Sequence, residues 1–553
     1  MIRVEQLKLH IDPEKRREPW TPGRELAKKT AAALGIDPSR IESIRLVRHS
    51  IDARKKPELY DICTVDLETD AQTEKKLLTL PEKKRKARPA PEKMPYVLPM
   101  CGESRLEHPP VVVGAGPAGL FGAYFLARAG FRPLLIERGD ETDARDEQVR
   151  RFWSGGAPDP ESNIQFGAGG AGAYSDGKLY TGVRDRGGRG EEILKILVEH
   201  GAPADILTEA HPHVGTDCLK DVVRSLIEAI RAHGGEVRFR TRLTGIRTDR
   251  NGALSQIITT NGEWETRVMM LAIGHSARDT MMMLSESGIL MEPKAFAVGY
   301  RVAHPQEIID RAQYGMASGG VLPPAIYKLT HQTEESRGVY SFCMCPGGKI
   351  VNASSEEGYL AVNGMSERAR DGKYANSAIV VTVSPNDYRR SGHPLDGMYF
   401  QRDMERKAYE AGQGKIPIAC YEDFRRMGQG EPAQSAMRRI SRLPDPREIF
   451  CGEAVYTGLR DILPDAVNRA ILSAMPEFGR KIRGFDDPET IFAAVESRTS
   501  SPVRMLRSED GESVSLGGLY PCGEGAGFAG GIVSAAMDGM RTAEQIIGRF
   551  KPV

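Results

Sequence analysis

Short hydrophobic runs broken by glycines mark the centre of this chain. Residues 111–113 are three valines, which is typical of a buried strand, and glycines then break the run. Residues 121–129 have the pattern of an apolar helix ended by Gly130, and residues 133–136 have that of a second buried strand. This order predicts a βαβ unit with parallel strands.

The N-terminal segment predicts a small α/β unit. Residues 2–9 alternate between apolar and polar side chains like a strand with one buried face. A helix over 25–34 and strands over 41–47 and 59–67 follow, which gives a βαββ sandwich with one helical layer. The basic residues 48–56 are expected to form the loop between the last two strands.

Charge also sets this segment apart. Residues 1–95 carry a net charge of +6, whereas the whole chain carries +1. A basic patch of this kind can meet phosphate, RNA or an acidic partner, but no aromatic stacking platform accompanies it, so we favour a solvated loop on a docking domain. Residues 82–93 combine charge and proline with few apolar side chains and predict a linker, with a nucleic-acid or nuclear-import tract as the alternative.

Further along, the pattern changes from a helix to antiparallel strands. Apolar residues recur at helical spacing over 221–233, and Gly234 and Gly235 end that helix. Strands are predicted over 236–240, 245–249, 254–259 and 264–273, with Asn-Gly hairpin turns at 251–252 and 261–262.

The spacing Gly114-x-Gly116-x-x-Gly119 is that of a dinucleotide-binding turn. The first glycine makes the turn, the second lets the backbone approach a pyrophosphate, and the third lets the helix pack on the strand. The helix N-terminus then faces the phosphates. Glu137, at the end of the second strand, is placed to accept hydrogen bonds from both ribose hydroxyls and to repel a 2′-phosphate, so NADP is disfavoured at this site.

A second glycine-rich stretch, residues 162–179, predicts another wall for the same ligand. Its glycines at 167, 169, 170 and 172 let the backbone lie against a flat or charged group where a Cβ would collide. The polar residues Gln165 and Lys178 flank these glycines, which a mere linker would not require.

Together with the turn Ala272-Ile273-Gly274-His275, these features resemble the FAD-binding scaffold of glutathione-reductase-like flavoproteins. Ile273 replaces the threonine that is usual in that turn. Residues 517–539 resemble the closing motif of the same group, in which an acid meets the ribityl or pyrophosphate region and a helix N-terminus points at the flavin pyrimidine. Glu524 stands where aspartate is usual. Amides at Gly530, Gly531 and Ile532 would stabilise the negative charge of a reduced flavin.

The whole chain resembles bacterial FAD-dependent dehydrogenases that carry an N-terminal α/β domain. The resemblance implies a Rossmann-like FAD-binding domain, with a central parallel sheet and an antiparallel meander, and an inserted α+β substrate or cap domain. We therefore expect an N-terminal βαββ domain over 1–80, a linker over 81–107, an FAD-binding domain over 108–284 and 496–553, and a cap over 285–495. The candidate FAD-binding residues are Gly114, Ala115, Gly116, Pro117, Ala118, Gly119, Glu137, Arg138, Gln165, Gly167, Gly169, Gly170, Ala171, Lys178, Leu243, Gly274, Gly523, Glu524, Gly530, Gly531 and Ile532.

Length, composition and cysteine spacing bear on the number of domains, the cellular location and the state of the thiols. A chain of 553 residues should contain more than one domain, and no apolar run is long enough to span a bilayer or to act as a signal peptide, so we expect a cytoplasmic protein. The eight cysteines show no CxxC pair and no zinc-ligand spacing, so we expect reduced thiols and no metal. Cys343 and Cys345 should lie on one side of a strand, and two ordinary buried thiols are favoured over a strained redox pair.

The expected function is hydride transfer between flavin N5 and a small or medium organic substrate. No second GxGxxG follows a strand, so NADH or NADPH would be a transient electron donor bound against the cap. Candidate catalytic residues are Arg498 and Arg504 as a carboxylate or phosphate clamp, His275 as an acid or base, and Cys345. The alternatives are an RNA-binding or RNA-modifying flavoprotein and a noncatalytic redox sensor; the sequence leaves the substrate and the oligomeric state open.

Overall fold

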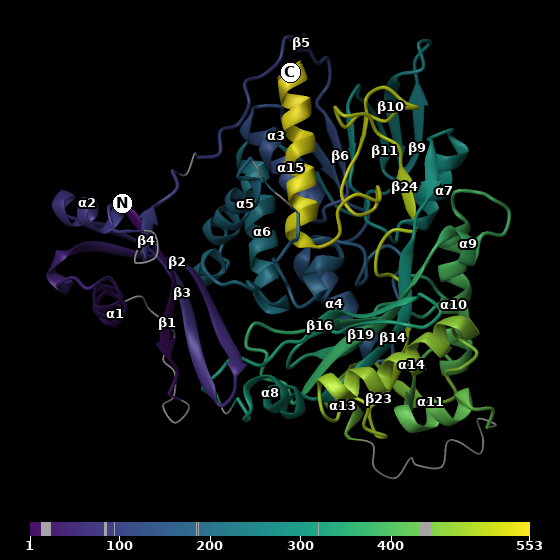
Figure 1. Cartoon of the computed structure of the whole chain (residues 1–553). Coiled ribbons are helices and arrows are strands. Elements are labelled where there is room, and N and C mark those ends of the chain that lie inside the picture. Colours follow the sequence, from purple (N-terminus) through teal and green to yellow (C-terminus); the bar gives the residue numbers. More distant parts are fainter. Residues whose placement is uncertain are drawn as a thin grey trace.

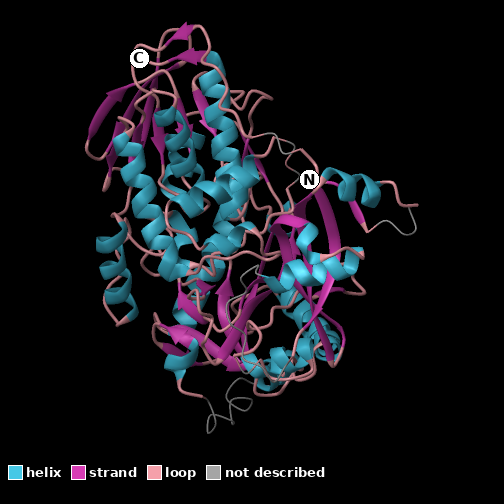
Figure 2. Ribbon diagram, turned by 90° about the vertical axis from the view of Figure 1, so that its left-hand side faces the viewer, coloured by secondary structure: helices cyan, strands magenta, loops and turns pink. Residues whose placement is uncertain are grey.

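The computed structural model describes residues 1–12, 24–81, 86–92, 95–183, 185, 187–318, 320–431 and 444–553. A parallel sheet covered by helices lies above a larger mixed sheet, and the N-terminal sheet lies to one side of both (Figure 1). Turned by 90°, the structure shows the long helices stacked together above the mixed sheet (Figure 2). Within the described residues, no helix is both long and apolar enough to cross a membrane.

The central sheet is parallel throughout and has the order β25-β12-β6-β7-β8. Alternate residues of its strands enter two separate cores: Val112 and Met270 face one, and Val111 and Met269 face the other. Because both faces are buried, the inner strands β6, β7 and β12 show continuous apolar runs rather than alternation. The strands are β6 (Val111–Val113), β7 (Leu134–Ile136), β8 (Glu236–Arg238), β12 (Met269–Leu271) and β25 (Leu519–Pro521).

Helices cover one face of this sheet and an antiparallel meander covers the other. The helices are α3 (Pro117–Arg128), α5 (Arg189–Glu199), α6 (Thr216–Ala232) and α15 (Ile532–Arg549), and the meander is β9 (Leu243–Thr248), β10 (Leu254–Thr259) and β11 (Gly262–Glu265). The predicted Rossmann-like architecture with a meander is confirmed. The single strand predicted over 264–273 is wrong: the chain leaves the meander after Glu265 and enters the parallel sheet at Met269, because the two halves pair with different partners.

The N-terminal unit forms a four-stranded sheet of order β2-β3-β1-β4. Its elements are β1 (Ile2–His10), α1 (Arg24–Leu34), β2 (Ile41–Lys55), β3 (Glu58–Thr69), α2 (Ala71–Leu78) and β4 (Ala87–Pro89). The loop predicted over 48–56 is wrong for most of its length, because His49 and Ile51 continue β2 and pair with β3. The predicted linker over 81–107 also contains β4, which pairs with β1. Residues 82–85 and 93 of the charged tract lie outside the described residues.

The inserted segment is built on a seven-stranded sheet of order β15-β16-β19-β14-β23-β20-β22, which we call the cap sheet. Its strands are β14 (Phe296–Pro305), β15 (Thr330–Gln332), β16 (Gly338–Cys345), β19 (Tyr374–Val383), β20 (Ile416–Cys420), β22 (Ala454–Tyr456) and β23 (Ile491–Glu496). Its helices are α8 (Gln306–Tyr314), α9 (Pro385–Tyr388), α10 (Asp396–Gly412), α11 (Tyr421–Gly428), α13 (Pro446–Ile449) and α14 (Asp465–Lys481).

Smaller elements join these layers. A three-stranded sheet of β18 (Val362–Met365), β17 (Lys349–Asn352) and β21 (Phe450–Cys451) lies beside the cap sheet. The pairs β13 (Met291–Pro293) with β24 (Val503–Met505), and β5 (Ser104–Arg105) with β26 (Phe550–Lys551), bring distant segments together. Helices α4 (Thr142–Trp153) and α7 (Arg278–Glu286) follow β7 and β12. The domain boundaries drawn from the sequence stay a prediction.

Candidate active site

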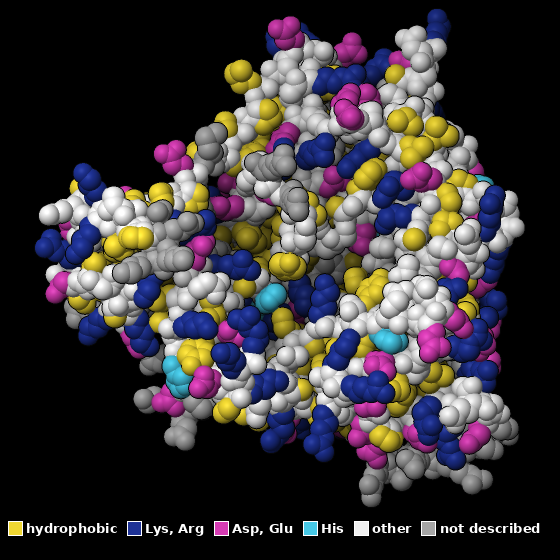
Figure 3. Space-filling view, in the orientation of Figure 1, with side chains coloured by type: hydrophobic (Ala, Val, Ile, Leu, Met, Phe, Trp, Pro, Cys, Tyr) yellow, Lys and Arg dark blue, Asp and Glu magenta, His cyan; other side chains and the backbone are white. Residues whose placement is uncertain are grey.

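A cavity lies where the central sheet meets the cap sheet. The glycine turn after β6, the glycine-rich loop, the turn after β12 and the turn before α15 form one side of it, and Phe342, Cys343, Asn363 and Glu496 form the other. In the space-filling view, the molecule is hollowed at its centre, with hydrophobic side chains inside and Lys and Arg side chains nearby (Figure 3).

Most of the predicted cofactor residues line this cavity. They are Gly114, Gly116, Pro117, Ala118, Glu137, Arg138, Gln165, Gly170, Ala171, Lys178, Leu243, Gly274, Gly523, Glu524, Gly531 and Ile532. Ala115, Gly119, Gly167, Gly169 and Gly530 are not among its lining residues. Gly119 has a packing role instead, because a Cβ there would lie 1.8 Å from the carbonyl oxygen of Gly114.

The backbones of Gly116, in the turn after β6, and Gly170, in the glycine-rich loop, face each other at the cavity. Gly114 has a φ of +101°, which turns the chain sharply after β6, and Gly116 is the N-cap residue of α3. A Cβ on Gly170 would lie 3.0 Å from the α carbon of Gly116. Side chains are therefore excluded from this wall, and the N-terminal amides of α3 remain available to an anion.

Glu137 links the turn after β6 to the glycine-rich loop. Its carboxylate accepts hydrogen bonds from the backbone N–H groups of Ala115 at 2.7 Å, Gly139 at 2.9 Å and Gly167 at 2.9 Å. A carboxylate has about four acceptor positions, so in this arrangement about one remains for a ribose hydroxyl instead of the two that we expected. The structural tie is a role that the βαβ pattern did not predict.

Arg138 and Lys178 are fixed by neighbouring acids. The Arg138 guanidinium lies 4.1 Å from the centre of the Phe166 ring and donates to Asp279 at 2.8 Å. The Nζ atom of Lys178 lies 3.0 Å from Asp176. Both cations line the cavity while their charge is partly compensated.

The closing turn presents a helix N-terminus and one acid. Gly531, with a φ of +86°, is the N-cap residue of α15, and Ile532 begins that helix. Burial raises the pKa of Glu524 to about 7, and Lys294 opposes this shift. A carboxyl group with such a pKa can hold a proton near neutral pH, which an ordinary glutamate does not do.

The predicted catalytic residues do not form one cluster. His275 lines the cavity, and burial together with the nearby Arg498 and Arg278 lowers its pKa to about 3, which favours the neutral imidazole at neutral pH. Arg504 does not line the cavity; it lies on β24, 3.7 Å from Glu292. The clamp of Arg498 and Arg504 stays a prediction; the two side chains belong to different ion pairs, and of the two only Arg498 lines the cavity.

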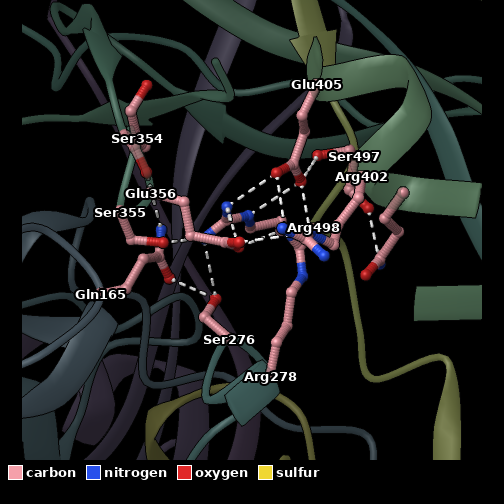
Figure 4. A network of polar contacts seen from close by, with 12 residues as sticks. Gln165, Ser276, Arg278, Ser354, Ser355, Glu356, Arg402, Glu405, Ser497 and Arg498 are labelled. Atoms are coloured by element: carbon pink, nitrogen blue, oxygen red, sulfur yellow. Dashed lines mark hydrogen bonds and ion pairs between the residues drawn. The ribbon is translucent and has the colours of Figure 1, made fainter. Parts of the chain in front are cut away.

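Arg498 belongs to a buried ionic network, which Figure 4 shows converging on Glu405. The Glu405 carboxylate accepts from Arg498 Nε at 2.9 Å, from Arg278 at 2.8 Å and from Ser497 Oγ at 2.6 Å. Arg278 also donates to Glu356 at 2.6 Å. Because α7 supplies Arg278 and α10 supplies Glu405, the network joins the segment after the central sheet to the cap.

The place of Glu405 in this network and of Cys343 in the cavity wall was not predicted from the sequence. Glu405 lies on the buried face of α10, at helical spacing from the buried Gln401 and Ala408, so a charge on an otherwise inward face was the available signal. Cys343 lines the cavity, whereas Cys345, the predicted candidate, is fully buried and is not a lining residue. Among the described residues, no group of three or more His, Cys, Asp or Glu side chains could hold a metal ion.

The chain is similar to a known protein over nearly its whole length. A protein of Clostridium beijerinckii (strain ATCC 51743 / NCIMB 8052), named "Uncharacterized protein", is 42% identical over 553 residues. The match covers 99% of this chain and 99% of that protein. The family model "FAD-dependent protein, C-terminal domain-like" matches residues 295–499, and "NAD(P)-binding Rossmann-like domain" matches 112–155. A domain of unknown function matches residues 1–68.

The chain belongs to a family of FAD-dependent proteins. Its cofactor is FAD. Similar solved structures include a geranylgeranyl bacteriochlorophyll reductase-like protein from Thermoplasma acidophilum (11% identity, TM-score 0.34, 80% of this chain and 78% of that chain). Another is glycine oxidase from Bacillus cereus (12% identity, TM-score 0.31, 80% and 95%).

The cavity of this FAD-dependent protein fits its cofactor. Gly116 and Gly170 form a side-chain-free cradle, and the N-termini of α3 and α15 both open toward the cavity. A Cβ on Gly523 would lie 2.8 Å from the Cβ of Ala118, so the closing turn also needs a glycine. These features suit the pyrophosphate and the flavin pyrimidine of FAD.

Proposed function

We propose that this protein is an FAD-dependent oxidoreductase that transfers hydride between its flavin and a small or medium organic substrate. The observation that supports this most strongly is the continuity of the cavity, which runs from the cofactor walls to Phe342, Cys343, Asn363 and Glu496 of the cap. A substrate between these two sides would be held against the cofactor. Bound FAD would supply two-electron chemistry at its N5 and C4a atoms.

Residues of the chain would bind the cofactor, hold a proton and position neighbouring groups. The α3 N-terminus would hold the pyrophosphate, and the α15 N-terminus would stabilise negative charge on the flavin pyrimidine. Glu524, with a pKa of about 7, would hold or release a proton at its carboxyl group during turnover. Arg498 would act as a positioning residue, because its guanidinium is committed to Glu405 and to the hydroxyls of Ser355 and Ser276.

NADH or NADPH remains the proposed transient electron donor, bound against the cap. The test is anaerobic mixing of the FAD-loaded protein with each nucleotide in turn while the flavin absorbance is followed. Rapid bleaching by one nucleotide would support a reductase half-reaction. If neither nucleotide bleaches the flavin and no organic substrate from a broad panel does so, hydride transfer is refuted.

The RNA-binding alternative gains no support from the placement of the basic segment. Arg54 pairs with Asp52 at 2.8 Å, and His49 lies between Asp61 and Glu209, each at 2.7 Å. It stays a prediction whose test is salt-dependent binding of tRNA that is lost when residues 1–95 are removed. The redox-sensor alternative also stays a prediction, and substrate turnover would contradict it.

A further inference from the structure

A β-bulge turns Cys343 toward the cofactor cavity. On β16, Phe342 pairs with Ala378 of β19, whereas Cys345 pairs with Asn376, so β16 carries one extra residue over this interval. Cys343 has a φ of +46°, which is uncommon for a residue other than glycine. Bulges re-aim side chains beside active sites, and here the bulged strand contributes Cys343 to the cavity lining.

Cys345 lies directly behind Cys343. Its Sγ donates to the carbonyl oxygen of Cys343 at 3.3 Å and lies 3.9 Å from the guanidinium of Arg301. Arg301 also donates to that carbonyl at 3.1 Å, and Lys178 Nζ donates to the carbonyl oxygen of Met344. Two cations therefore surround a pair of thiols at the edge of the cavity.

These surroundings shift the pKa values of the two thiols in opposite directions. The hydrogen bond with the Cys345 thiol, together with Lys178 and Arg301, lowers the pKa of Cys343 despite its burial. The same interaction, with burial, raises the pKa of Cys345. The Cys345 sulfur, 3.3 Å from the Cys343 carbonyl oxygen, thus lies beside a cysteine with thiolate character, and the thiolate is the reactive form in disulfide formation.

We propose that Cys343 and Cys345 are a second redox centre of this protein, a dithiol that exchanges two electrons with the bound FAD. The inference rests on the proposed function in that it requires FAD in the adjoining cavity. As the S–S bond forms, the Cys343 thiolate and the Cys345 thiol together lose two electrons, and the Cys345 thiol loses its proton. The FAD takes up both electrons and that proton, which balances charge and atoms. The reverse reaction returns the pair to thiolate and thiol.

The thiols can be counted without any assay of activity. Trypsin cleavage after Arg337 and Lys349 releases a peptide, residues 338–349, whose two cysteines are the proposed pair. We expect the full-length FAD-loaded protein, equilibrated anaerobically in dithiothreitol buffers of increasing oxidation and then alkylated, to yield this peptide first with two alkyl groups. It should then appear unalkylated and two hydrogen masses lighter. The other six cysteines should stay alkylated throughout.

An anaerobic dithionite titration measures the coupling to the flavin. The pre-oxidised wild type should consume four electrons per FAD, whereas Cys343→Ser should consume two with the same FAD content. Cys420→Ser is the matched control: Cys420 is another buried thiol, lies on β20 and does not line the cavity, so four electrons are expected.

Several outcomes separate this proposal from the proposed function. A peptide that is doubly alkylated in every buffer, or a wild type that consumes two electrons, would overturn the dithiol centre even if a nucleotide bleaches the flavin. A disulfide that forms in this peptide with four-electron uptake would uphold the centre even if no hydride donor is found. If Cys343→Ser fails to retain FAD, Cys345→Ser takes its place with the same expected two-electron uptake.

Discussion

The Glu405 network gives a prediction whose size follows from the structure. In Glu405→Gln, the amide keeps the shape of the side chain but removes the negative charge between Arg278 and Arg498, whose side chains are 4% and 6% exposed. Removing one partner of a buried ion pair costs about 3–5 kcal/mol, because the remaining charge is left uncompensated. Glu356, 2.6 Å from Arg278, compensates part of that charge, so we expect about 3 kcal/mol.

For a unit of roughly 200 residues, a loss of this size lowers the melting temperature by about 10 °C. Calorimetry or dye-monitored melting of the FAD-loaded protein measures the shift. Glu410→Gln is the matched control: Glu410 lies on the same helix and pairs with Arg406 at 2.9 Å on the surface, where solvent screens such a pair and its loss should hardly change the melting temperature. Equal shifts in the two variants would refute the reasoning.

The same network predicts a pH dependence. Burial alone would raise the pKa of Glu405, but Arg278 and Arg498 hold it well below its usual range. A carboxyl group whose pKa is depressed on folding adds stability above its unfolded pKa of about 4.3 and loses it as the pH falls further. The stability difference between wild type and Glu405→Gln should therefore be constant above about pH 5.5 and shrink below about pH 4. A difference that does not change down to pH 3 would contradict this.

Three further predictions concern the cofactor wall and the N-terminal sheet. Gly170→Ala should cut FAD content at least tenfold, because its Cβ would press on the backbone of Gly116, whereas Gly182→Ala, with no atom near its Cβ, should bind FAD normally; released flavin measures both. Glu524→Gln should leave the melting temperature unchanged below pH 5 and raise it by a few degrees above pH 7, since the raised pKa of Glu524 makes the folded state lose stability as its carboxyl group ionises. His49→Gln should make the N-terminal sheet more sensitive to proteolysis at pH 6 but not near pH 10. Burial lowers the pKa of His49, but the hydrogen bonds from its ring to two acids outweigh burial and raise the pKa to about 9. The stability that protonated His49 adds is therefore complete below pH 6.5 and is lost as the pH rises through 9.

The cofactor half could be predicted from sequence because its signals are local. A strand buried on both faces shows a continuous apolar run, and the glycines of the turn at 114–119 stand at fixed spacing, so the βαβ unit was predicted from the sequence alone. Elements whose limits depend on their partners were harder. The strand that ends at Glu265 and the strand that begins at Met269 look continuous in the sequence, and sheet pairing alone divides them.

The cap side of the cavity was harder to predict, because its residues are placed by contacts between distant segments. Arg498 and Arg504 are six residues apart and of one type, yet one meets Glu405 of the cap and the other Glu292 of a peripheral strand pair. Cys343 reaches the cavity because of a bulge, which is set by strand register and has no signature in the composition of β16. Predicting such contacts requires the pairing of the whole cap sheet, which periodicity does not supply.

The most direct test of the whole account is the FAD content of the purified chain, read from its visible spectrum and from the flavin released on denaturation. We predict oxidised-flavin absorption bands and one FAD per chain, either as purified or after incubation with FAD. A chain that is folded by circular dichroism but binds no FAD after reconstitution would contradict the assignment of the cavity between Gly116 and Gly170, and with it the proposed chemistry.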